Sequence, residues 1–480
     1  MIFVFSALNI RTSGARISVI EPTSDEESPD TPYREVYSQA LTWAEDGIGN
    51  YDDTDAWMKA IEGLLEGTSN HWMGGDLETI RSICVSGTSA SCLMVDRQTQ
   101  QVTRSPRMYN YDILVAAPEK SGETAAKEAM ELLDRHAPPR HTARARTGSL
   151  AKLLAWAKEK PLDENEMLCH QSDFISMRLL SQTMPLKSDW HNCLKLGYDV
   201  RQLKWPEWLV SCLREAGIPE PVEVTRGAIP VDVVSPGLPL GTIDKSMAQR
   251  LGLSPDTVVV GGTTDSNAAF FAAAGTTPSY GTAVTSLGST LAMKQLSQTY
   301  VEDADRGVYS HRFPNFKHPE DEAWLVGGAS NVGCAILRQL EFSNEELVEL
   351  SGGIDPMKDS PLEYYPLTKV GERFPVADSN KEPILEPVPA TRQEYLHGIL
   401  QSIGNVELEG FAVLQELGAP APTIVWTCGG GSKNEMWSKL RERRLAERFQ
   451  GSSIKVRKAE CTEASFGAAL LAAASFEFKA

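Results

Sequence analysis

The chain has 480 residues, 41% of them hydrophobic and 23% charged, which is the composition of a globular protein large enough for two or three domains. Its formal net charge of −18 argues against nucleic acid or an anionic membrane as the main partner, because both attract positively charged proteins. No stretch approaches the ~18 consecutive apolar residues that would span a bilayer. Small molecules remain the expected partners.

The cysteines and the first residues bear on where the protein resides. Eight cysteines are spread along the chain without a C-x-x-C pair, which fits free thiols in a reducing compartment better than disulfides or zinc ligands. The opening stretch MIFVFSALNI is apolar but lacks a basic segment and a cleavage site, so it predicts a buried first strand rather than a signal peptide. We expect a cytoplasmic protein; an organelle such as the chloroplast is the alternative if the N-terminus is truncated.

Strand-like runs alternate with amphipathic segments along the chain, and this order predicts an α/β protein. Residues 2–10 and 15–20 are the expected arms of a hairpin, joined by the turn Thr12-Ser13-Gly14. Apolar residues at helical spacing predict a helix over 55–65, behind a cap at Thr54. We expect this helix to cover the sheet.

Two strand-like runs, 81–85 and 92–95, bracket the turn Gly87-Thr88-Ser89. Residues 227–239 have the Pro/Gly punctuation of a connector. We therefore predict two domains, 1–250 and 251–480. In this prediction the last helix of the chain can pack against the first domain.

One acid stands out in the second half. Thr257–Val260 is a β-branched run that predicts a buried strand, and residues 261–266 follow as a turn with little side-chain bulk. Asp265 therefore lies past the carboxyl end of a strand, where ligands bind in open α/β sheets and where an Asp can accept a hydroxyl proton or face a metal. The alternative is that Asp265 only caps a helix over 267–274.

Glycine-containing turns in this half leave backbone N–H groups free to approach an anion. A strand-like run over 283–287 leads into the turn Gly288-Ser289-Thr290. A tight strand-to-helix turn is predicted at Gly429, Gly430 and Gly431, where the chain backbone is open to a ligand. The alternative for this turn is an ordinary helix start with Trp437 in the core. The small-residue helix over 462–473 is expected to pack on the sheet without a chemical role.

An ordered set of motifs resembles the FGGY carbohydrate kinases, and within them most closely the xylulose kinase-like D-ribulose kinases of cyanobacteria and plants. The resemblance covers nearly the whole chain. Its motifs include TSGAR (12–16), GTSAS (87–91), HNCLKLGYD (191–199), GTTDSNAAF (262–270), AVTSLGST (283–290) and GGGSKNEMW (429–437). The resemblance implies an α/β protein with a two-lobed, actin/hexokinase-like (ribonuclease H-like) fold and a central cleft.

The resemblance also implies an activity: transfer of a phosphoryl group from ATP, with Mg²⁺, to a hydroxyl of a small sugar such as D-ribulose or a related ketopentose or pentitol. The first lobe would hold the sugar and the second the nucleotide, in a monomer or homodimer. Asp265 would be the catalytic residue and would face Mg²⁺, directly or through water. The other implied contacts are Asn9 and Ser89, with Asp265, for the sugar; Thr12, Ser13, Gly14, Gly288, Ser289 and Thr290 for phosphate; and Gly327, Gly328, Gly430, Gly431, Asn434 and Trp437 for the nucleotide.

Three positions depart from the family pattern. Asn9 replaces an acid that helps to hold Mg²⁺ and the sugar, and a neutral amide keeps an oxygen ligand but loses the charge. Arg11 replaces a glycine, so its guanidinium would either clash with the terminal phosphate or hold it in a bidentate contact. Ser86 replaces another acid. Three explanations stay open: a kinase with a rearranged metal site, a catalytically weakened homologue that acts as a nucleotide or sugar sensor, or an error at the start of the gene model.

Overall fold

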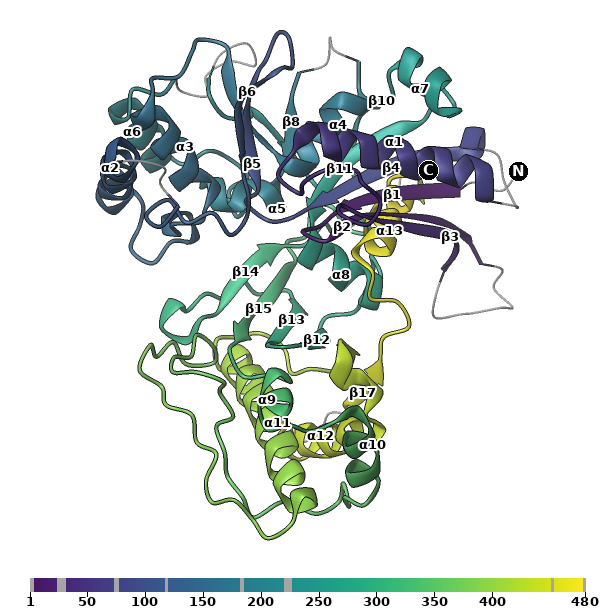
Figure 1. Cartoon of the computed structure of the whole chain (residues 1–480), viewed down its shortest axis with the longest axis vertical. Coiled ribbons are helices and arrows are strands. Elements are labelled where there is room, and N and C mark those ends of the chain that lie inside the picture. Colours follow the sequence, from purple (N-terminus) through teal and green to yellow (C-terminus); the bar gives the residue numbers. More distant parts are fainter. Residues whose placement is uncertain are drawn as a thin grey trace. The chain divides into compact units, whose positions relative to one another are not determined.

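A computed structural model describes residues 4–23, 32–72, 77–116, 120–181, 185–219, 227–449 and 453–477 (Figure 1). The chain divides into two compact units. The first unit consists of Met1–Ala272 and Glu463–Ala480, and the second of Ala273–Thr462. Among the described residues, no helix combines the length and the apolar character that crossing a bilayer requires.

The first unit is built on a six-stranded sheet. Its strand order is β10-β11-β4-β1-β2-β3. Strands β1, β4 and β11 run parallel, whereas β2, β3 and β10 are antiparallel to their neighbours. The bounds are β1 Val4–Ile10, β2 Gly14–Pro22, β3 Tyr33–Thr42, β4 Ile80–Gly87, β10 Pro239–Thr242 and β11 Val258–Thr264.

Alternate residues of a strand point to opposite faces of the sheet, and β1 carries apolar side chains on both. Helices therefore cover both faces. On one face, Leu8 and Ile10 share a core with Trp57 of helix α1 (Thr54–His71). On the other face, the ring of Phe5 lies 5.7 Å from that of Phe476 in α13 (Ala464–Glu477). Helix α4 (Gln171–Leu179) packs on β4 and β11, and α7 (Lys245–Leu251) contacts α1.

The rest of the first unit forms a second core. A three-stranded sheet, in the order β6-β5-β7, packs with three helices around buried residues such as Leu154, Leu168 and Leu213. Its elements are β5 Cys92–Asp96, β6 Val102–Arg107, β7 Glu166–His170, α2 Lys120–His136, α3 Ser149–Glu159 and α6 Glu207–Glu215. Strands β8 (Lys187–Asp189) and β9 (Asp232–Val234) form a short parallel pair, and β8 leads into α5 (Trp190–Cys193) and the one-turn helix η3 (Leu194–Leu196).

The second unit is built on another six-stranded sheet. Its strand order is β14-β15-β13-β12-β16-β17, with β12, β16 and β17 parallel. The strands are β12 Thr282–Leu287, β13 Leu291–Ser297, β14 Tyr309–Arg312, β15 Trp324–Ser330, β16 Ile424–Cys428 and β17 Lys455–Lys458. The helices are α9 Ala335–Gln339, α10 Asn344–Gly352, α11 Arg392–Glu416 and α12 Glu435–Arg448.

The two sheets share a topology that the sequence did not reveal. Strands β3-β2-β1-β4-β11 of the first unit and β15-β13-β12-β16-β17 of the second have the same order and the same pattern of directions. In each sheet, the first strand of a hairpin has a parallel neighbour, and a further parallel strand follows that neighbour. In both hairpins three residues join the strands, 11–13 in the first unit and 288–290 in the second.

Three expectations about the elements can be compared with the structure. The predicted hairpin around residues 12–14 is present as β1 and β2. The helix after residue 53 is longer than predicted, and its cap is Asp53, which accepts a hydrogen bond from the backbone N–H of Asp55, rather than Thr54. The boundary between the units falls after Ala272 instead of residue 250, because β11 pairs with β4 inside the first sheet.

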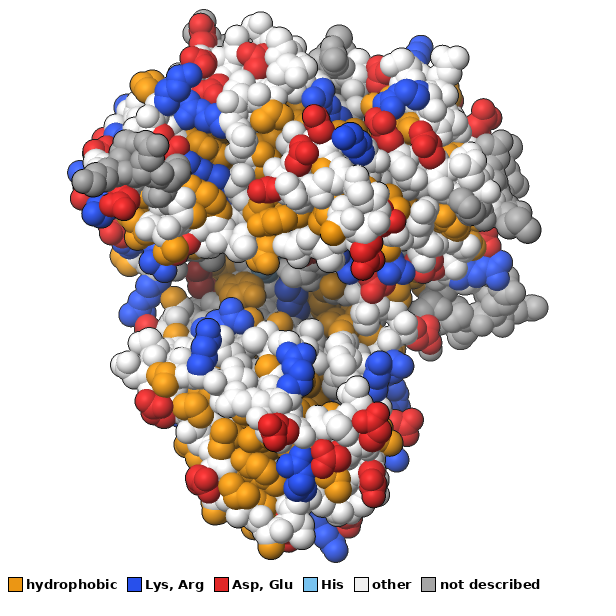
Figure 2. All heavy atoms as spheres, in the orientation of Figure 1, with side chains coloured by type: hydrophobic (Ala, Val, Ile, Leu, Met, Phe, Trp, Pro, Cys, Tyr) orange, Lys and Arg blue, Asp and Glu red, His pale blue; other side chains and the backbone are white. Residues whose placement is uncertain are grey.

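The last helix of the chain, α13, belongs to the first unit. A Cβ at Gly467 of this helix would lie 1.8 Å from the carbonyl oxygen of Ala268, so the helix needs a glycine there to pack closely on α8 (Asp265–Ala274). Acidic and basic side chains are interspersed over the face drawn in Figure 2, so the net charge of −18 is not gathered into one patch on that face.

Candidate active site

Buried polar side chains without partners lie along one edge of the first sheet, meaning here the edge formed by the carboxyl ends of its parallel strands β1, β4 and β11. Asn9 of β1 pairs in register with Ser86 of β4, and Ser86 pairs with Thr263 of β11, so the three lie side by side at the carboxyl ends of parallel strands. Asn9 and Ser86 are fully buried. Within the described part of the chain, neither amide atom of Asn9 nor the hydroxyl of Ser86 has a hydrogen-bond partner, and the same holds for Thr264. Such groups are costly when left unpaired, so this edge is suited to a polar ligand.

Asp265 follows directly on this edge. Strand β11 ends at Thr264, and Asp265 is the first residue of helix α8, where it is half-buried. Its Oδ1 accepts a hydrogen bond from the backbone N–H of Ser266 at 2.7 Å. The expected place of the acid is correct, but the residues 261–264 before it belong to the strand rather than to a turn. The helix also begins two residues earlier than predicted, so Asp265 lies in its first turn.

Lys195 and His191 are two titratable residues beside this site that the sequence did not place in it. Burial lowers the pKa of Lys195, and the charge of the Asp265 carboxylate opposes this shift, so the two groups form an electrostatic pair. The ring nitrogen Nδ1 of His191 lies 2.7 Å from the hydroxyl of Thr263. Both residues belong to the motif HNCLKLGYD, which was the signal that could have identified them.

A buried acid holds the helix that carries His191. Asp189 caps α5 by accepting hydrogen bonds from the backbone N–H groups of His191 and Asn192 at 2.9 and 3.0 Å. Burial, and then the nearby carboxylate of Asp173, raise the pKa of Asp189 above its usual range. Asp173 in turn contacts Nδ1 of His170 at 3.0 Å. These acids and His170 are therefore structural supports.

The loop after β4, which carries Ser89, is fixed by a buried lysine and a glutamine. The backbone N–H of Thr88 donates to Oε1 of Gln171 at 3.0 Å. The ammonium of Lys152 donates to the carbonyl oxygens of Ala90 and Met108 at 2.8 and 2.7 Å. Lys152 is fully buried, and this burial lowers its pKa to about 8. Ser89 is half-buried within this tightly held loop.

The turn between β1 and β2 exposes the hydroxyls of Thr12 and Ser13. The backbone N–H of Arg11 donates to the carbonyl of Gly14 at 2.8 Å and closes the turn. A Cβ at Gly14 would lie 1.8 Å from the carbonyl oxygen of Leu41, so β3 alone accounts for this glycine. The guanidinium of Arg11 does not fill the turn, because it pairs with the carboxylate of Glu463 at 2.8 Å.

Two glycine-containing turns of the second unit meet at the carboxyl ends of neighbouring strands. Strands β12 and β16 are parallel, and they lead into Gly288-Ser289-Thr290 and into Gly429, respectively. Gly429 has a φ of +80°, and a Cβ there would lie 2.6 Å from the carbonyl oxygen of Leu287, so the turns touch and require glycine. The nearest described atom to a Cβ at Gly288 would be 3.7 Å away. This turn can therefore approach an anion closely.

Arg338 adds a positive charge that the sequence did not indicate. It lies in α9, and its Nη2 donates to the hydroxyl of Ser289 at 3.1 Å. The hydroxyls of Ser289 and Thr290 are exposed. A phosphate bound by the backbone of this turn would thus find a guanidinium beside it.

The second glycine turn begins a helix, as predicted, but one of its expected nucleotide contacts is in the core. Asn434 caps α12 by accepting from the backbone N–H of Trp437 at 3.0 Å, and its amide donates to Ser351 at 2.8 Å. Trp437 is only 1% exposed, so the alternative interpretation of this residue as core packing holds. Gly430 is exposed, whereas a Cβ at Gly431 would lie 2.7 Å from Leu287 and from Trp437.

Gly327 and Gly328 have a packing role that the sequence reasoning did not consider. Both are buried inside strand β15. A Cβ at Gly327 would lie 1.9 Å from the carbonyl oxygen of Met293, and one at Gly328 would lie 2.2 Å from the ring of Phe374. The neighbouring strand and an aromatic ring therefore account for these glycines without a bound nucleotide.

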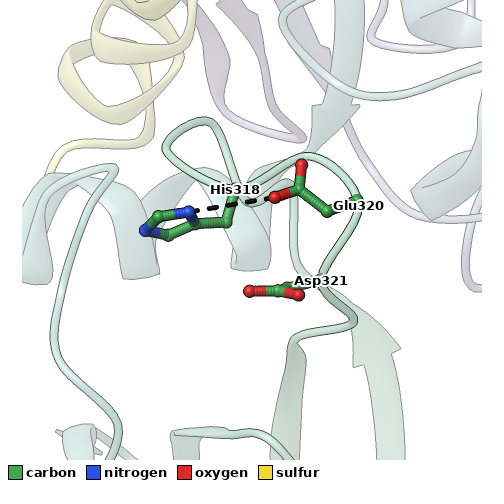
Figure 3. Close-up of side chains that lie close together, drawn as sticks. All are labelled: His318, Glu320 and Asp321. Atoms are coloured by element: carbon green, nitrogen blue, oxygen red, sulfur yellow. Dashed lines mark ion pairs between the residues drawn. The ribbon is translucent and has the colours of Figure 1, made fainter.

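A group of possible metal ligands lies elsewhere. In the part of the chain that the structure describes, His318, Glu320 and Asp321 are the one group of three His, Cys, Asp or Glu residues whose ligand atoms all lie within 4.8 Å of one another (Figure 3). All three are exposed and follow β14 in the second unit. Asp265 is not part of such a group, so a divalent ion there would need further oxygen ligands besides this carboxylate.

Comparison with known proteins places this geometry in a fold class. No protein-family model matches the chain. Solved structures with a similar fold include a gluconate kinase from Lactobacillus acidophilus (TM-score 0.72, 14% identity), a xylulose kinase from Rhodospirillum rubrum (0.71, 19%) and a glycerol kinase from Plasmodium falciparum with ADP (0.72, 14%). The similarity covers 99%, 98% and 99% of this chain and 90%, 89% and 90% of those chains. The chain therefore has the actin/hexokinase-like fold of two-domain carbohydrate kinases, which confirms the predicted fold class.

Proposed function

We propose that the chain is an ATP-dependent carbohydrate kinase of the FGGY type. The observation that carries this proposal is the buried edge of the first sheet, where Asn9 and Ser86 lack partners among the described residues and the adjacent strand ends at Asp265. A sugar offers hydroxyls that can donate to and accept from such groups. The fold shared with gluconate, xylulose and glycerol kinases supports the same class of substrate.

In the proposed reaction, Asp265 accepts a proton from the sugar hydroxyl. The O–H bond breaks as the sugar oxygen forms a bond to the terminal phosphorus of ATP, and the bond from that phosphorus to the bridging oxygen breaks, so ADP leaves. Lys195 lies close enough to Asp265 to stabilise its carboxylate before the transfer. The turns Gly288–Thr290 and Gly429–Asn434 would bind the nucleotide, with Arg338 beside the phosphates.

Magnesium fits the first-unit site. The Oδ1 of Asn9 is buried and receives no hydrogen bond from any described residue, so it is available as a ligand together with the carboxylate of Asp265. When bound, Mg²⁺ would neutralise charge on the phosphates. Because Asn9 is neutral, we propose that this site holds Mg²⁺ weakly without ATP.

D-ribulose is the proposed substrate, followed by xylulose and a pentitol, on the strength of the sequence motifs. The test is ADP release with Mg²⁺ over a panel that contains D-ribulose, D-xylulose, ribitol, gluconate and glycerol. We expect Asp265→Asn to lower kcat by about 10²- to 10⁴-fold, whereas the matched variant Asp256→Asn, in the exposed turn before β11, should keep the parental rate. The proposal fails if no sugar raises ADP release above the sugar-free rate.

A non-catalytic nucleotide or sugar sensor is the second candidate, because the amide at Asn9 provides no negative charge for a metal. The variant that combines Asn9→Asp with Arg11→Gly distinguishes the two. A near-zero parental rate that rises by orders of magnitude in this variant would favour the sensor. A parental kcat in the ordinary kinase range, about 1 to 100 s⁻¹, would exclude it.

A further inference from the structure

An ion-pair cluster lies beside the turn between β1 and β2. Nη2 of Arg11 lies 2.8 Å from Oε2 of Glu463, and Nη1 of Arg16 lies 3.6 Å from the same oxygen. Arg11 is the first residue of the turn that exposes Thr12 and Ser13, whereas Glu463 comes from the other end of the chain, directly before α13. One carboxylate therefore serves two guanidinium groups.

The pair between Arg11 and Glu463 is weak enough to exchange. Their side chains are 37% and 34% exposed, and ion pairs of that exposure contribute little stability because water screens them. A phosphate carries more charge than a carboxylate and can accept two parallel hydrogen bonds from one guanidinium, which makes it the stronger partner. The charge–charge attraction thus favours phosphate over Glu463 when a phosphate enters the turn.

Arg16 makes this exchange possible without stranding a charge. If the guanidinium of Arg11 leaves, Glu463 keeps Arg16 as a cationic neighbour. Arg16 is itself held by a hydrogen bond from its Nη2 to the hydroxyl of Ser38 at 3.3 Å. The other acids near the turn, Glu45 and Asp46, accept hydrogen bonds from Thr42, which pairs with Gly14, and so they are engaged separately.

We propose that Arg11 is a phosphate-binding residue and that Glu463 is its internal competitor. Arg11 rests on Glu463 when the turn is empty and transfers to the terminal phosphate of a nucleoside triphosphate when the turn is filled. Glu463 is thus a positioning residue, which keeps the guanidinium out of the turn until a phosphate arrives. The inference rests on the proposed function for the identity of the nucleotide, and it resolves the choice at Arg11 between a clash and a contact.

The test is calorimetric binding of ATP and of ADP to the full chain, because only ATP brings the terminal phosphate. Arg11→Gln should weaken ATP binding by about tenfold, which corresponds to 1.4 kcal/mol, and should leave the Kd for ADP within about twofold of the parental value. Glu463→Gln should strengthen ATP binding by about two- to fivefold, again without an effect on ADP. A merely structural role of either residue would change both nucleotides alike.

Arg34→Gln is the matched control. Arg34 forms an exposed pair with Glu21 at 2.7 Å, at the far end of β2 from the turn, so this variant should bind both nucleotides like the parent. Thermal unfolding of each variant shows that it is folded. Equal ATP affinity of the parent and Arg11→Gln, or equal losses for ATP and ADP, would overturn the proposal.

The inference and the proposed function can fail separately. A parent that binds ATP and shows the Arg11 effect, but phosphorylates no sugar, would refute the kinase and support the exchange. A parent that phosphorylates a sugar, while Arg11→Gln keeps the parental ATP affinity, would support the kinase and refute the exchange. A parent that binds neither nucleotide would overturn both.

Discussion

A buried ion pair in the second unit supports the strands β12 and β16, which lead to the two glycine-containing turns. Arg441 of α12 donates from Nε and Nη2 to the two carboxylate oxygens of Glu407 in α11, each at 2.6 Å. Its Nη1 donates to the hydroxyl of Thr427 in β16 at 3.0 Å, and Thr285 in β12 donates to Glu407 at 2.6 Å. The side chains of Arg441 and Glu407 are 2% and 1% exposed.

Removing one partner of this pair should be far worse than removing both. Arg441→Met leaves the Glu407 carboxylate buried with the Thr285 hydroxyl as its remaining donor in the cluster, which costs roughly 3–5 kcal/mol. Adding Glu407→Leu removes the stranded charge. The remaining hydroxyls belong to residues paired in register on neighbouring strands, so they can bond to each other, and the double variant should recover part of the loss.

Scanning calorimetry measures the effect. At roughly 2–4 °C per kcal/mol for a unit of this size, Arg441→Met should lower the Tm of the second unit by about 6–20 °C. The control Lys455→Met breaks an exposed pair with Glu442 in the same unit and should cost at most about 1 kcal/mol. The reasoning is refuted if Arg441→Met melts within about 2 °C of the parent. It is also refuted if the double variant melts at a lower temperature than Arg441→Met.

Three further predictions concern the first unit and the two hairpin turns proposed to bind phosphate. Gly14→Ala should destabilise the protein strongly, because the new Cβ would meet the carbonyl of Leu41, whereas Gly288→Ala should leave the Tm unchanged and raise the KM for ATP; equal Tm values for the two variants would contradict this. Asn9→Asp should lower the Mg²⁺ concentration that gives half-maximal ADP release by roughly tenfold, since a carboxylate adds charge to the site; an unchanged Mg²⁺ requirement would count against a metal contact at this position. Burial lowers the pKa of Lys152 to about 8, so between about pH 8 and the unfolded value near 10.4 the unfolded chain binds more protons, and stability should rise with pH. Chemical unfolding at several pH values should show this rise in the parent and lose it in Lys152→Met; the same slope in both would disprove the assignment.

Local patterns predicted which strands precede the candidate site residues, although β11 continues to Thr264, past the predicted run that ends at Val260. The β-branched run before Asp265 and the hairpin around Thr12 both depend on neighbouring residues, so the sequence contains the signals that place them. The boundary after Ala272 could not be predicted in this way. It depends on the pairing of β11 with β4, and those strands are separated by most of the first unit.

Long-range contacts also decide features of the candidate site that local patterns do not show. The small size of Gly327 and Gly328 is required by Met293 and Phe374, which are distant in sequence. Arg11 could be interpreted as a clash or as a contact from the sequence, because nothing near it indicates that Glu463, 452 residues further on, binds its guanidinium. His191 and Lys195 were missed because a lone His or Lys in a loop carries little signal until its neighbours are known.

Because the two sheets share their strand order, the hairpin loop that carries Arg11 can be compared with the corresponding loop of the second sheet. Counted from the ends of β1 and β12, Arg11 and Gly288 hold equivalent first places in two three-residue hairpin loops, and each loop continues with two hydroxyl side chains. The second loop borrows its cation from Arg338, whereas the first carries one of its own. Exchanging residues between these loops, within a single polypeptide, would test whether a guanidinium in the loop itself can replace one supplied by a neighbouring helix in contacting a phosphate.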